Sequence, residues 1–129
     1  LHAYLGGTGF EIMANSDNVL RGGLTTKHVD IPTLLEVVDA RPIEPIVQRP
    51  LVVERIASYD TPVPEFRLDR LDLDGSATVS GPAILLCTDG IVYAASHPLE
   101  RGAAAWLSAG DGPVELRGRG TVYRAGANL

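Results

Sequence analysis

The second half of the chain is a series of short apolar runs separated by turn residues. Residues 65–73 alternate between polar and apolar side chains, which is the period of a half-buried strand. Further short runs that read as strands lie at 52–57, 77–80, 83–88, 91–96, 103–108, 114–116 and 121–124. Asp89-Gly90, residues 111–113 and residues 118–120 read as turns between them. The pattern predicts an all-β fold, a sandwich or a small barrel of the jelly-roll or cupin kind.

The first fifty residues carry a different pattern. Residues 1–5, 10–14 and 19–24 predict three short strands, the first two separated by a glycine-rich turn. The apolar positions 34, 35, 37 and 38 follow Pro32 at helical spacing, and Asp30 is a suitable cap, so a short helix is expected there. Three prolines between 42 and 50 then predict an extended connector.

Composition narrows the function classes. With 45% hydrophobic and 21% charged residues in 129 positions, the chain reads as a globular protein of ordinary domain size. Its net charge of −5 argues against a nucleic-acid partner, and no apolar run is long enough to cross a membrane. Cys87 is the sole cysteine, so no disulfide forms within the chain, which fits a cytoplasmic location.

The strongest chemical signal lies in the first 27 residues. The segments HAYL (2–5), EIMANSDNVLR (11–21) and GGLTTK (22–27) bring together an imidazole, a phenol, two carboxylates, a guanidinium and an ammonium. A buried core has little use for this mixture, because each buried charge needs a partner. A site that handles a charged substrate does need it.

These three segments resemble the type I, zinc-dependent mannose-6-phosphate isomerases. The resemblance implies that residues 1–40 are the C-terminal end of a catalytic cupin domain, that 41–58 are a connector, and that 59–129 are a C-terminal cupin-like β domain. It also implies an aldose-ketose isomerase of carbohydrate metabolism that interconverts mannose 6-phosphate and fructose 6-phosphate through a cis-enediol. In that case the chain packs on the N-terminal catalytic part of the same protein and is inactive alone.

The resemblance assigns roles to six residues. His2 matches a zinc ligand, and the other ligands of the single Zn²⁺ ion in the full-length enzyme would lie upstream of this chain. Arg21 matches the active-site arginine; a guanidinium never loses its proton and suits the negative charge of an enediol intermediate. Four further residues are assigned to the sugar phosphate substrate: Tyr4, Glu11, Asp17 and Lys27.

Several alternatives stay open at this stage. Asp17 could orient Arg21, bind a sugar hydroxyl or brace the local bend through backbone hydrogen bonds. Either Glu11 or Tyr4 could move a proton. The alternative for the whole chain is a non-catalytic cupin module that binds a sugar or a protein partner.

Overall fold

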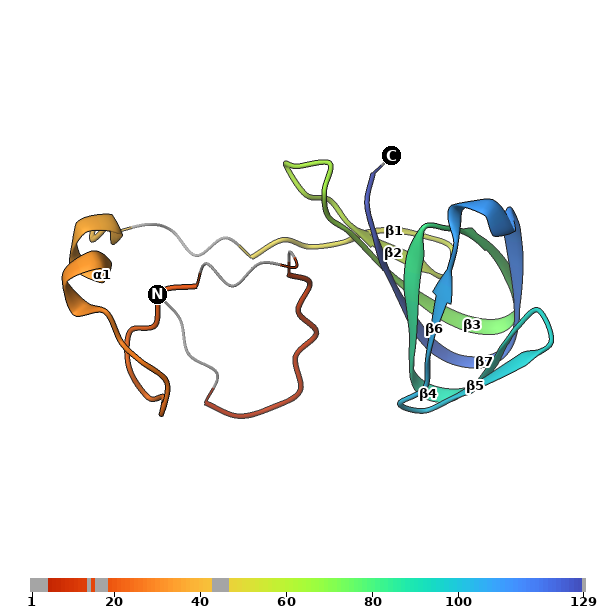
Figure 1. The fold of residues 1–129 in the computed structure, drawn as a ribbon. Helices are drawn as coiled ribbons and strands as arrows, with labels where there is room; N and C mark the ends of the chain where they lie inside the picture. Colours follow the sequence, from red (N-terminus) through yellow and green to blue (C-terminus); the bar gives the residue numbers. More distant parts are fainter. Residues whose placement is uncertain (1–4, 14, 16–18, 43–46, 129) are drawn as a thin grey trace. The chain divides into compact units, whose positions relative to one another are not determined.

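The chain folds as two units, Leu1–Ile46 and Val47–Leu129. The computed structural model describes residues 5–13, 15, 19–42 and 47–128. In the first unit the helix α1 spans Ile31–Val37 (Figure 1). Asp30 caps it as expected, because its carboxylate accepts a hydrogen bond from the backbone N–H of Thr33 at 3.1 Å. Pro32 occupies the first turn, where its missing N–H costs nothing.

Of the three strands expected in the first unit, those at 10–14 and 19–24 are wrong for the residues described, and the one at 1–5 lies outside the described residues except for Leu5. Residues 10–13 and 19–24 form no strand, and none of the described residues of this unit is buried. A strand is stable only when a neighbour takes up its backbone hydrogen bonds and covers one face. No described segment of residues 5–42 provides such a neighbour.

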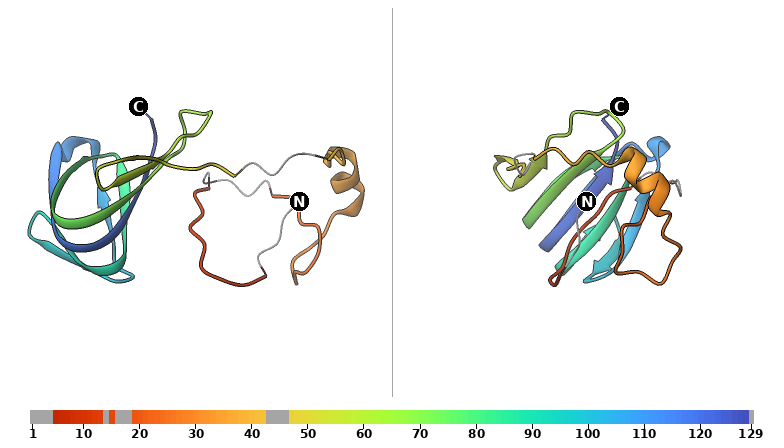
Figure 2. Two further views of the ribbon diagram at one scale, coloured as in Figure 1. Left: turned by 180° about the vertical axis from the view of Figure 1, so that it is seen from behind. Right: turned by 90° about the vertical axis from the view of Figure 1, so that its left-hand side faces the viewer.

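The second unit is a strongly curved antiparallel sheet in the order β1-β2-β3-β7-β4-β5, with β6 paired to β4 (Figure 1). The all-β class expected from the sequence is therefore confirmed. The view on the right of Figure 2 shows β3, β7 and β4 side by side. The strands are β1 (Leu51–Val53), β2 (Ile56–Tyr59), β3 (Arg67–Ser80), β4 (Ala83–Ala94), β5 (His97–Glu100), β6 (Ala104–Leu107) and β7 (Pro113–Gly126), with a 3₁₀ turn at Ala109–Asp111 before β7.

Three long strands replace six of the short ones that the sequence predicts. β3 joins the runs at 65–73 and 77–80, and β4 continues through Asp89-Gly90, which is a strand irregularity and not the expected hairpin turn. β7 likewise continues through residues 118–120. Glycine explains the difference: Gly75 and Gly118 lie opposite each other with φ of 129° and 132°, a conformation in which β3 and β7 bend together without ending.

The core lies on the concave face of this curved sheet. Alternate residues of β3, β4 and β7 point inward, and Leu85, Leu116 and Val122 are fully buried there. Cys87 is buried among them, as expected for a small apolar side chain. The described residues contain no helix long and apolar enough to cross a membrane.

Candidate functional site

The six residues singled out in the first 27 positions divide into two groups. His2, Tyr4 and Asp17 lie outside the described residues. Glu11, Arg21 and Lys27 are described: the side chains of Glu11 and Lys27 are exposed, and that of Arg21 is half-buried. The structure therefore gives a direct view of only half of the predicted site.

Glu11 lies at a cavity. The cavity has a volume of about 410 Å³, and its other described lining residues are Gly6, Gly7, Thr8 and Gly9. That volume is within the range of small-molecule sites. Neither Arg21 nor Lys27 belongs to the described lining, so the structure does not bring the three residues together around this cavity.

The chain turns directly after Arg21. Gly23 has a φ of 144° and Leu24 a φ of 51°, both in the left-handed region. Further along, the backbone N–H of Lys27 donates to the hydroxyl of Thr25 at 3.1 Å. This local hydrogen bond fixes the backbone of Lys27 and leaves its ammonium group exposed, where it can meet an anion.

The described residues do not by themselves fit a zinc ion. They contain no group of three or more histidine, cysteine, aspartate or glutamate side chains that could hold a metal. A zinc site takes about four such ligands in tetrahedral arrangement. Any zinc bound with the help of this chain therefore depends on residues outside the described part.

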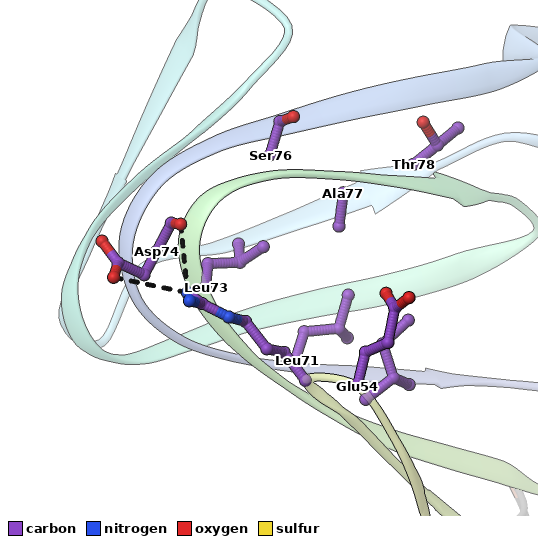
Figure 3. A pocket seen from close by; sticks show the side chains of 9 residues that line it. Glu54, Leu71, Leu73, Asp74, Ser76, Ala77 and Thr78 are labelled. Atoms are coloured by element: carbon purple, nitrogen blue, oxygen red, sulfur yellow. Dashed lines mark hydrogen bonds and ion pairs between the residues drawn. The ribbon is translucent and has the colours of Figure 1, made fainter.

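A cavity of the second unit lies between the β1-β2 turn and the concave side of β3 (Figure 3). Its volume is about 720 Å³, and Leu71, Leu73 and Ala77 form its apolar floor. At its edge Arg55 donates to the backbone carbonyl of Asp74 at 3.0 Å. Arg119 pairs with the Asp74 carboxylate at 3.0 Å, and this hydrogen bond, with the charges of Arg119 and Arg55, lowers the pKa of Asp74.

The described lining of this cavity holds two carboxylates, those of Glu54 and Asp74. Its described lining contains no histidine or cysteine, and the Asp74 carboxylate is already held by arginines. A carboxylate with a lowered pKa is a poor general base at neutral pH.

A buried ion pair closes the other end of the concave face. Asp69 is only 3% exposed, and its Oδ2 atom accepts hydrogen bonds from Arg124 at 2.8 Å and from Arg67 at 2.9 Å. Two other nitrogens of Arg124 donate to the carbonyl of Ser80 at 3.2 and 3.0 Å. Arg124 on β7 thus connects Asp69, near the start of β3, with Ser80, the last residue of that strand.

The protonation of Asp69 reflects opposing effects. Burial alone raises the pKa of Asp69, but the hydroxyl of Ser58 and the guanidinium groups of Arg124 and Arg67 outweigh burial and leave the pKa lowered. The alternation of 65–73 changes phase at Asp69-Arg70, because the apolar residues before this pair are at even positions and those after it at odd positions. The sequence alone therefore does not show that Asp69 is buried, as it is in the structure.

The antiparallel sheet of the second unit defines the chain as a mostly β protein, and its sequence carries a polar segment at residues 2–27. Sequence comparison shows which proteins the chain is similar to. The mannose-6-phosphate isomerase of Escherichia coli K12 is 38% identical over 132 residues, which cover 95% of this chain and 34% of that protein. The human mannose-6-phosphate isomerase is 34% identical over 127 residues, covering 85% of this chain and 30% of that protein. No protein-family model matches the chain.

Solved structures agree with the sequence relatives. Mannose 6-phosphate isomerase from Salmonella typhimurium, bound to fructose 6-phosphate and zinc, superposes with a TM-score of 0.76 at 32% identity. The match covers 91% of this chain and 32% of that one. The resemblance found in the sequence is confirmed: the chain is similar to the C-terminal portion of mannose-6-phosphate isomerases, and it spans about a third of the length of the relatives it matches.

Proposed function

We propose that this chain is the C-terminal portion of an isomerase that interconverts mannose 6-phosphate and fructose 6-phosphate with one Zn²⁺ per enzyme. The observation that carries the proposal is the match over nine-tenths of the chain to a mannose 6-phosphate isomerase solved with fructose 6-phosphate and zinc. The polar segment of residues 2–27 supports the same proposal on chemical grounds, because it contains the types of side chain that a sugar phosphate isomerase needs.

Spacing in the neighbour structures supports the choice of site residues. Alanine variants of the Salmonella typhimurium enzyme have been solved for a histidine, for a glutamate nine positions later and for an arginine ten positions after that. His2, Glu11 and Arg21 have the same spacing in this chain. The variants of a lysine and a second glutamate affect positions more than a hundred residues before that histidine, so they have no counterpart here.

The three described site residues would have separate tasks. Arg21 compensates the negative charge that develops on the sugar oxygens as the cis-enediol forms, since its forked donors are fixed and permanently charged. Lys27 neutralises the substrate phosphate, because its side chain is exposed while its backbone N–H is hydrogen-bonded to the hydroxyl of Thr25. Glu11, at the wall of its cavity, accepts a hydrogen bond from a sugar hydroxyl or takes a proton.

The remaining assignments concern residues that the structure does not describe. Tyr4 and Asp17 are proposed to bind the sugar, and His2 is proposed as one of the zinc ligands. When bound, zinc supplies polarisation of the sugar oxygens. The other ligands would come from the part of the enzyme outside this chain, because the described residues hold no metal cluster. The enzyme is proposed to be cytoplasmic.

The test is turnover by the full-length enzyme. We expect it to convert mannose 6-phosphate to fructose 6-phosphate, to lose this activity on treatment with a chelator, and to regain it with zinc. The 129-residue chain alone should be inactive at any zinc concentration. Full-length protein that is folded and zinc-loaded, yet turns over neither sugar phosphate, would refute the proposal.

A further inference from the structure

The outward face of the sheet carries a line of apolar side chains that crosses five strands. The residues of this line lie directly opposite one another in the strand pairing, which puts them on the same side of the sheet. Tyr59 of β2 faces Leu68 of β3, Leu68 faces Ala125 of β7, Ala125 faces Ile84 of β4, and Ile84 faces Trp106 of β6. These five residues are referred to below as the apolar row.

The apolar row is open to solvent at its β4-β6 end. Ile84 is 50% exposed and Trp106 is 64% exposed, while the other three members are half-buried. Trp106 therefore exposes a large aromatic side chain to solvent next to another exposed apolar residue. Contiguous exposed apolar patches mark interaction sites. Tryptophan is among the residues that contribute most at protein interfaces.

The same face becomes charged further along β4. Ile91 is as exposed as Ile84, at 49%, but it lies opposite Arg119, which in turn lies opposite its ion-pair partner Asp74. The outward face is therefore apolar along the row and charged around Ile91. A partner with an apolar surface is matched by the row and not by the surroundings of Ile91.

We infer that the apolar row is the surface on which this unit packs against the part of the isomerase that lies outside this chain. The inference rests on the proposed function, and it adds to that function the face of the sheet that makes the contact. The relatives and the neighbour structures are about three times as long as this chain. The row contains no charged residue, so the surface that covers it is apolar as well.

Tethering favours this occupant over a second copy of the chain. Polypeptide joined to the same chain is present at a millimolar effective concentration, whereas a second molecule must be recruited from dilute solution. A second copy remains an outcome that the experiment can reveal.

The chain offers a closely matched pair of variants, Ile84→Glu and Ile91→Glu, with the same residue type, the same strand and the same exposure. In the full-length enzyme we expect Ile84→Glu to lower the thermal unfolding midpoint by at least about 4 °C more than Ile91→Glu does. In the 129-residue chain the two variants should differ by less than about 2 °C, because both positions are then exposed.

Equal shifts of the two variants in the full-length enzyme would overturn the inference. A 129-residue chain that sediments as a dimer, and becomes monomeric with Ile84→Glu but not with Ile91→Glu, would assign the row to a second copy instead. Turnover of mannose 6-phosphate by the unmodified enzyme is measured separately. A lack of turnover would therefore count against the proposed function alone.

Discussion

Removal of the buried carboxylate of Asp69 is predicted to destabilise the sheet far more than removal of an exposed carboxylate of the same strand. Replacing Asp69 by alanine leaves Arg124 without its carboxylate, and the side chain of Arg124 is only 12% exposed. Removing one partner of a buried pair costs about 3–5 kcal/mol, because the remaining charge is left uncompensated. The contact with Arg67 adds little, since that side chain is 43% exposed.

The matched control is Asp72→Ala on the same strand. Asp72 pairs with Arg70 at 2.9 Å, but both side chains are well exposed, at 48% and 38%. An exposed pair of this kind contributes less than about 1 kcal/mol. Urea unfolding of the 129-residue chain, followed by far-ultraviolet circular dichroism, compares the two variants. An Asp69→Ala variant no less stable than Asp72→Ala would refute the reasoning.

The pH dependence of stability gives a second readout of the same group. The pKa of Asp69 is lower in the folded chain than its ordinary value, so the folded state favours the charged form. Its stabilisation is fully present above the ordinary carboxyl pKa, and it is lost as the pH falls through the lowered, folded-state value. We expect Asp69→Ala to flatten the acid side of the curve of unfolding free energy against pH, measured by urea unfolding at several pH values; an unchanged acid side would contradict this role of Asp69.

Three further predictions concern the site and the core. Lys27→Ala in the full-length enzyme should raise KM for mannose 6-phosphate more than it lowers kcat, because the ammonium acts mainly in substrate binding; steady-state kinetics with the opposite split would remove that role. His2→Ala should lower the zinc content found by elemental analysis, and an unchanged metal stoichiometry would exclude His2 as a ligand. Leu85→Ala should destabilise the 129-residue chain by about 2–5 kcal/mol in urea unfolding, since Leu85 is completely buried in the core.

The sequence predicted the class of the fold better than its connections. Alternation in 65–73 located the start of β3, and the cap at Asp30 located the start of α1. The turn signals were misleading at Asp89-Gly90 and at 118–120, because glycine permits a sharp bend inside a paired strand as readily as it permits a turn between strands. Pairing with a neighbour decides between the two, and a single sequence does not contain that information.

The candidate site shows a similar division. The chemistry of residues 2–27 was visible in the sequence, because so many polar and charged groups in one short segment indicate a charged substrate. The strands expected at 10–14 and 19–24 do not form among the described residues, since strand formation depends on partners and not on the local pattern alone. The burial of Asp69 is not visible in the sequence, because the alternation changes phase at this residue and its partner Arg124 lies 55 positions further along the chain.

The most direct test of the central claim is the kinetics of Arg21→Lys in the full-length enzyme. If Arg21 compensates charge that develops along the reaction path, lysine should not replace it, since the charge is kept but the forked donors are lost. We expect kcat for mannose 6-phosphate to fall by about 10²–10³, with a much smaller change in KM, while the zinc content stays constant. An Arg21→Lys enzyme with near-normal kcat would contradict the assignment of this segment to the active site.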